Sequence, residues 1–217
     1  MNNFFSLDSK FMTAMSRGAD LVLLNLFFLI TSVPIFTIGA AATALYTVAS
    51  RIGTEREAGV FRPYFRAFRD ALRQGTALWL ILLAVSCAIG ADVYLFYRMS
   101  GPVRYVYCLC LVMGALLVLA AGYVFPLISQ FENGIFATLK NAVLLSIGYL
   151  PRSILMAVLH LLPLAVLLIA PAAFFQAAFL WVFLYFSAAA YFDGLILRKV
   201  FAPFLAQEEG AKEEEAQ

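Results

Sequence analysis

Long runs of apolar residues dominate the chain, and short polar stretches separate them. A run of about 20 apolar residues matches a helix that crosses the hydrocarbon core of a bilayer. We predict five crossings, at residues 21–48, 76–97, 103–128, 152–169 and 172–197. The predicted fold class is therefore all-α, a polytopic membrane helix bundle with five transmembrane helices and additional cytoplasmic amphipathic helices.

The first apolar run is too long for one untilted helix, and Pro34 and Gly39 interrupt it. Proline removes a backbone donor and breaks a helix, so we predict a helix break at these two residues. If the break is a reversal instead of a kink, the chain has six spans and the N-terminus changes sides. Residues 21–33 would then cover only about 20 Å at 1.5 Å per residue, less than the bilayer core. Both topologies remain open.

The composition fits this interpretation. Apolar residues make up 64% of the 217 residues and the mean hydropathy is +0.90, which excludes an ordinary water-soluble domain. The segments outside the predicted crossings are too short for a soluble catalytic domain. We predict a single integral membrane domain over residues 1–205, followed by a disordered acidic tail at 206–217.

Basic residues are distributed unevenly, and this predicts the orientation. With five crossings, 11 of the 15 Lys and Arg residues share the side that holds the loop at 50–75 and the C-terminus. With a reversal at Pro34 the same side also holds the N-terminus, and its total rises to 13 basic residues. Because cytoplasmic loops carry the excess of Lys and Arg, we expect this side and the C-terminus to be cytoplasmic in a bacterial membrane.

The loop before the second crossing contains an amphipathic pattern over residues 61–74. Four arginines fall in one helical stripe and aromatic side chains fall beside them. A helix of this kind lies in the headgroup plane as a positively charged anchor, or presents a docking surface to another subunit. The candidate lipid- or partner-binding residues are Arg62, Arg66, Arg69, Arg73, Phe61, Phe65 and Phe68.

A similar pattern recurs 71 residues later, where residues 136–143 align with residues 65–72. Each copy precedes a crossing. The alignment predicts an internal repeat over residues 21–97 and 103–170, with 172–197 as a closing helix.

Polar residues inside the predicted crossings are the other candidates, because burying them in lipid is costly. Asn25 is expected to tie helices together. His160, the only histidine, is expected to bond a backbone group or hydroxyl of a neighbouring helix.

Asp92 and Asp193 are two further intramembrane candidates. We expect structural ion pairs with nearby arginines, Arg98 or Arg104 for Asp92 and Arg198 for Asp193, or carboxyls that snorkel to a membrane interface. A substrate or proton site at either carboxyl is the alternative interpretation.

Catalytic and metal-binding motifs are missing from the sequence. It has no Walker glycine loop, HExxH or GxSxG, and its single histidine lacks further ligands nearby. We therefore predict no enzymatic activity, no metal, no cofactor and no nucleic-acid partner.

Four stretches of the sequence carry a resemblance to a known family. Residues 25–28 and 32–46 resemble the N-terminal signature of the YesL-like family of small bacterial multi-pass membrane proteins, and residues 64–74 and 139–152 resemble its other recurrent phrases. Phe27 and Phe28 stand where the family commonly carries a tryptophan. The resemblance implies an uncharacterised membrane protein often encoded beside ABC-type carbohydrate importers. It supplies no catalytic residues.

Two functions follow from these observations. The first is a non-enzymatic accessory or regulatory partner of a carbohydrate transport system, packed against an importer or sensor subunit. The alternative is a small-solute transporter or channel with a polar path near the broken first helix, lined by Asn25, Asp92 and Asp193. The solute, the partner and homo-oligomer formation stay open.

Overall fold

The computed structural model describes residues 2–52 and 59–215, and every regular element in these ranges is helical. The elements are α1 (Asn2–Ser32), η1 (Ile35–Thr37), α2 (Ile38–Ala49), α3 (Phe61–Arg98), η2 (Pro102–Tyr105), α4 (Val106–Gln130), α5 (Ile135–Gly148), α6 (Leu150–Ile169), α7 (Pro171–Gln176), α8 (Ala178–Leu180), the π-helical segment η3 (Trp181–Tyr185) and α9 (Phe186–Glu215).

Five segments of the described chain are long and apolar enough to cross a membrane: Met15–Ser32, Phe61–Arg98, Pro102–Gln130, Leu150–Ile169 and Ala178–Ala202. This confirms the predicted all-α membrane fold and the number of spans. The last span begins later than predicted, because residues 171–176 form the separate short helix α7.

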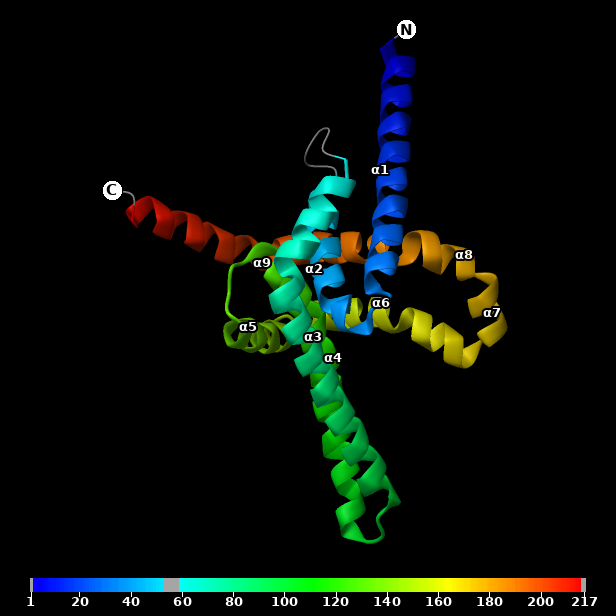
Figure 1. Cartoon of the computed structure of the whole chain (residues 1–217), viewed down its shortest axis with the longest axis vertical. Coiled ribbons are helices and arrows are strands. Elements are labelled where there is room, and N and C mark those ends of the chain that lie inside the picture. Colours follow the sequence, from blue (N-terminus) through cyan, green and yellow to red (C-terminus); the bar gives the residue numbers. More distant parts are fainter. Residues whose placement is uncertain (1, 53–58, 216–217) are drawn as a thin grey trace.

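The chain reverses direction after α1, so the break is a reversal and not a kink, although α2 is too short to count as a sixth span. α1 ends at Ser32, and α2 returns beside it (Figure 1). Asn25 contacts Ser187 and Tyr46 contacts Asp193, less than two turns further along the same helix. A straight continuation of α1 would separate Asn25 and Tyr46 by about 30 Å. The first apolar run is therefore one span plus a short helix that turns back.

Pro34 lies at this reversal, as predicted, but Gly39 does not break a helix. The Thr37 hydroxyl donates to the carbonyls of Thr31 and Pro34 at 2.6 and 2.7 Å and so stabilises the turn. Gly39 lies inside α2 against α3, where a Cβ would come within 2.1 Å of the Gly75 carbonyl oxygen. Gly39 thus permits close packing of two helix backbones.

The segment with the four arginines is part of a longer helix than predicted. α3 runs without a break from Phe61 to Arg98, so residues 61–74 are its first turns and not a separate helix in the headgroup plane. Residues 136–143 belong to a separate helix, α5. It ends before α6 because Tyr149 has a non-helical backbone and Pro151 lies in the first turn of α6. The two copies of the predicted repeat therefore differ.

Two pairs of long helices extend from a shared core, α3 with α4 and α6 with α9. α3 and α4 form a hairpin, which ends at the turn around Gly101, and α6 and α9 run crosswise to it (Figure 1). The core at the centre includes Leu24, Leu45, Leu78, Tyr123 and Val200.

α9 runs as a helix from Phe186 to Glu215, and Ala, Glu, Gln and Lys in its last turns all favour helix.

Candidate functional site: an arginine cavity and a buried polar cluster

A large cavity of about 1390 Å³ lies where α2, the first turns of α3 and the link between α4 and α5 meet. We call it the arginine cavity. Its polar lining comprises Thr43, Thr47, Arg51, Arg62, Arg66, Asp70, Gln74, Ser129, Gln130, Glu132 and Asn133. Phe61 and Arg62 at the beginning of α3 also line it.

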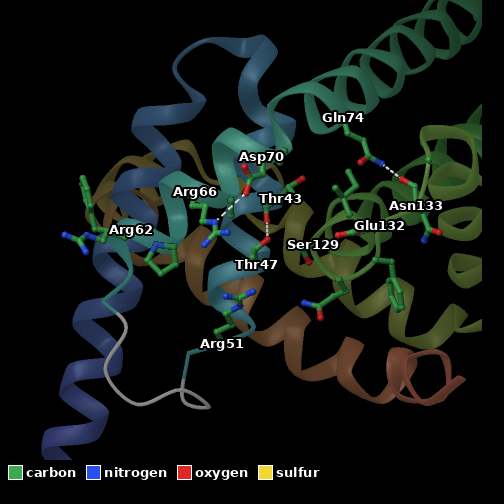
Figure 2. A pocket seen from close by; sticks show the side chains of 18 of the residues that line it. Thr43, Thr47, Arg51, Arg62, Arg66, Asp70, Gln74, Ser129, Glu132 and Asn133 are labelled. Atoms are coloured by element: carbon green, nitrogen blue, oxygen red, sulfur yellow. Dashed lines mark hydrogen bonds and ion pairs between the residues drawn. The ribbon is translucent and has the colours of Figure 1, made fainter. Parts of the chain in front are cut away.

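Hydrogen bonds between elements and within α2 hold the walls of the arginine cavity. The Gln74 amide donates to the Asn133 carbonyl at 2.6 Å and joins α3 to the α4–α5 link. The Thr47 hydroxyl donates to the Thr43 carbonyl at 2.8 Å, within α2. Figure 2 shows Arg66, Thr47 and Arg51 close together, with Gln74 and Asn133 across the cavity.

The arginine side chains retain most of their exposure. Arg66 lies 4.0 Å from Asp70, but both side chains are largely exposed, at 87% and 70%, so this ion pair contributes little. Arg62 is also exposed and stands at the edge of the cavity (Figure 2). These charges are available to an anionic group from outside.

Only two of the four arginines in the predicted helical stripe line the arginine cavity. Arg62 and Arg66 line it, whereas Arg69 and Arg73 are exposed outside its lining. The neighbouring aromatic residues contact another helix and do not simply face lipid.

These aromatic residues pack on α1. The ring centroid of Phe27 lies 5.4 Å from that of Phe61 and 5.5 Å from that of Phe65. Phe68 is partly buried and stacks on Tyr64. The amphipathic face therefore fixes α3 against α1.

A second polar site is buried between α2, α6 and α9, and we call it the Tyr46 cluster. The Tyr46 hydroxyl lies 2.8 Å from Oδ2 of Asp193 and 3.0 Å from Nε2 of His160. Nε2 and Oδ2 are 3.4 Å apart, so the three atoms form a triangle. The Asp193 side chain is fully buried, while that of His160 is 42% exposed.

The expected ion pairs of both aspartates are not formed. Asp193 faces Tyr46 and His160, and Arg198 donates to the Ser50 carbonyl at 2.8 Å. Asp92 is exposed on α3 and has no ion pair among the described residues.

The arginines near Asp92 contact aromatic rings instead. Arg98 lies over the ring of Tyr94 and Arg104 over that of Tyr97. Among the described residues, Asp92 has no hydrogen bond or ion pair with Asn25 or Asp193.

Asn25 serves the structure, as expected. Its amide donates to the carbonyls of Trp181 and Val182 at 3.2 and 2.6 Å, and its oxygen accepts from the Ser187 amide at 2.9 Å. These backbone groups belong to, or follow, the π-helical segment. Asn25 therefore joins α1 to the last span.

Sequence reasoning missed Tyr46, although it named both of its partners. His160 bonds a neighbouring hydroxyl, as expected, and its Nδ1 lies 2.8 Å from the Met156 carbonyl. Tyr46 ends the segment 32–46 that resembles the YesL-like signature, but that resemblance implies no role for any residue, so the sequence did not mark Tyr46 as part of a site.

Two comparisons with known proteins match parts of the chain. Residues 21–93 match a family model described as a protein of unknown function, DUF624. The chain is 28% identical to the uncharacterized protein YesL of Bacillus subtilis (strain 168) over 151 residues. This aligned stretch covers 69% of this chain and 71% of that protein. The resemblance to the YesL-like family is confirmed. No solved structure matches the chain.

The segment that matches the DUF624 model includes α2 and most of α3. It therefore holds Tyr46 and the α2 and α3 walls of the arginine cavity. His160 and Asp193 lie beyond it.

Proposed function

We propose that the protein is a non-enzymatic accessory or regulatory subunit of a bacterial carbohydrate uptake system. In this proposal the arginine cavity docks an acidic segment of an importer or sensor subunit. The observation that carries it is a cavity of about 1390 Å³ lined by Arg51, Arg62 and Arg66. Arginine binds carboxylates through two parallel N–H groups, so these side chains suit acidic partners.

The remaining polar lining provides hydrogen-bonding groups for recognition. Threonine hydroxyls and the Gln74, Gln130 and Asn133 amides provide donors and acceptors at the cavity wall. Asp70 and Glu132 also line the cavity and can accept hydrogen bonds from donors of a partner. A binding role fits this set of side chains.

The proposed orientation places the arginine cavity in the cytoplasm. Arg51, Arg62 and Arg66 line it, and Arg198 of the last span reaches the end of α2 beside it. The positive-inside rule then assigns this end, and with it the C-terminus, to the inner face of the cytoplasmic membrane. The carbohydrate setting rests on the family resemblance alone.

The docking proposal is tested by affinity purification at native expression from mild detergent. The cavity variant Arg62→Glu/Arg66→Glu is compared with Arg98→Glu/Arg104→Glu, which reverses the same number of charges at the opposite end. We expect the wild type and the second variant to recover an importer or sensor subunit, and the cavity variant to lose it. Recovery of no such subunit by the wild type, or of equal amounts by both variants, contradicts the proposal. Capture of anionic lipid alone also contradicts it.

The orientation is tested separately by labelling single cysteines in intact cells. In a chain whose native cysteines are replaced by serine, Asn3→Cys and Lys212→Cys are compared with Ser100→Cys. We expect a membrane-impermeant reagent to label residue 100 and to leave residues 3 and 212 unlabelled until the cells are opened. Labelling of residue 212 in intact cells would refute the cytoplasmic C-terminus.

A further inference from the structure

The Tyr46 cluster has a hydrogen-bond requirement that its own hydroxyl proton cannot meet. A carbonyl oxygen only accepts, so the contact of His160 Nδ1 with the Met156 carbonyl places a proton on Nδ1. The remaining ring nitrogen, Nε2, then faces the Tyr46 hydroxyl and Oδ2 of Asp193. The tautomer of the neutral ring is therefore fixed.

The Tyr46 hydroxyl has one proton and two close contacts, with Asp193 and with His160. If its hydroxyl donates to Asp193, as the 2.8 Å contact indicates, the Tyr46 oxygen can only accept from His160. Nε2 must then also carry a proton. If the hydroxyl donates to Nε2 instead, Oδ2 must carry the proton and donate to Tyr46. Each arrangement needs one proton beyond those of a neutral imidazole, a phenol and a carboxylate.

We propose that the Tyr46 cluster is a proton-binding site that shares one exchangeable proton between His160 and Asp193 through the Tyr46 hydroxyl. In the transfer, the Nε2–H bond breaks and the Tyr46 oxygen accepts that proton while its own proton passes to Oδ2 of Asp193. The phenol keeps one proton throughout, so an imidazolium and a carboxylate become a neutral imidazole and a carboxylic acid. The net charge does not change.

Burial supports the need for this proton. The Asp193 carboxyl is fully buried, and among the described residues its Oδ1 has no hydrogen-bond partner. An uncompensated carboxylate in such a place is costly, whereas a shared proton removes the excess charge.

The other titratable groups near Asp193 have different hydrogen-bond partners. Tyr185 of η3 donates to the Leu159 carbonyl, and the Tyr123 hydroxyl of α4 contacts that of Ser153. The proton of the cluster is therefore left to His160, Tyr46 and Asp193.

The proton has a route to water. A second cavity, of about 350 Å³, reaches Tyr46 and is lined by Ser50, Gln130 and Arg198 as well. Gln130 and Arg198 are exposed, so this cavity opens at the surface. On the other side, the partly exposed His160 ring lies at the surface of α6. The cluster thus connects the second cavity to the outer face of α6.

The single histidine makes a direct test possible. The full chain is prepared with ¹⁵N-labelled histidine and a tag free of histidine, reconstituted in lipid nanodiscs, and studied by NMR at neutral pH. His160 then gives the one ring spectrum of the protein. In the wild type we expect a protonated Nδ1 and an Nε2 signal shifted from that of a bare ring nitrogen. A bare, unprotonated Nδ1 would overturn the proposal without recourse to any variant.

Three variants locate the shared proton. Tyr46→Phe removes the bridging hydroxyl and Asp193→Asn removes the carboxylate, and we expect both to return Nε2 to the signal of an unprotonated nitrogen. Tyr185→Phe is the matched control, because its hydroxyl bonds the carbonyl next to His160 without touching the cluster. It should keep the wild-type spectrum. An Nε2 signal that is the same in the wild type and in Asp193→Asn would overturn the proposal.

Discussion

Tyr46 and Thr47 are neighbours on α2, yet they face different surroundings. Tyr46 is buried in a cluster with two partners, and Thr47 lines a wide cavity beside exposed arginines. In the Tyr46 cluster every close contact restricts the others, whereas in the arginine cavity the side chains of Arg62 and Arg66 are exposed to solvent. One short helix therefore holds a site sensitive to single atoms and a site sensitive mainly to net charge.

The largest effect on both sites is expected from Gly39→Ala. A Cβ there would meet the Gly75 carbonyl oxygen at 2.1 Å and the Trp79 Cβ at 2.6 Å, so α2 must move away from α3. We expect the free energy of unfolding to fall by about 2–3 kcal/mol, as for an overpacked core. Denaturant titration in mixed micelles measures it.

Gly122→Ala is the control for this substitution. Its Cβ would meet only the Met156 methyl, at an ordinary 3.8 Å. Alanine favours helix over glycine, so we expect about 0.5–1 kcal/mol of stabilisation. Equal destabilisation by both variants would show that α2 does not depend on close approach at Gly39.

The Tyr46→Phe variant should affect the cluster and spare the cavity. It leaves the buried Asp193 without its hydroxyl donor, and we expect a loss of about 1–3 kcal/mol in the same titration. Tyr105→Phe, at a position 71% exposed, should change stability by less than about 0.5 kcal/mol. A Tyr46→Phe protein as stable as the wild type would remove the distinction between the two sites.

The Gln74→Ala variant tests the wall of the cavity. It removes the 2.6 Å bond to the Asn133 carbonyl, and because this region is only partly buried we expect a loss of about 0.5–1.5 kcal/mol. The His160 spectrum should stay unchanged in this variant. A changed ring signal would mean that the two faces of α2 are coupled.

The smallest effect on stability is expected from Arg62→Gln/Arg66→Gln. Both side chains are exposed, so the free energy of unfolding should change by less than about 0.5 kcal/mol. Affinity for an acidic partner should nevertheless fall about tenfold or more, since hydrogen bonds to charged groups contribute about 1.5–3 kcal/mol each. Titration calorimetry with the recovered partner measures this. A large loss of stability with unchanged affinity would assign these arginines to the fold.

The sequence predicted those parts of the molecule that depend on local pattern. Apolar length identified five spans, and helical spacing placed Arg62 and Arg66 on one face. Proline chemistry located the break at Pro34 but not its direction, because the direction depends on where α2 finds its packing partner. That partner is the Gly75 region of α3, which no pattern around Gly39 reveals.

The Tyr46 cluster lay outside this kind of prediction. Its three residues come from three helices and meet only after those helices pack. Asp193 was assigned to Arg198 because the two lie close in sequence, but the helix turns them to different neighbours. Intramembrane polarity alone therefore identified two of the three residues and missed the link between them.

The hydrogen bonds of Asn25 to the π-helical segment can form only after the last span has been synthesised. The Asn25 amide and the Trp181 carbonyl are 156 residues apart, so the first is made long before the second. Because domains form as the chain emerges from the ribosome, α1 must wait with an unmatched amide until the last span arrives. Insertion of the final span closes the molecule, and a chain that stops before Trp181 would leave that amide without its partners.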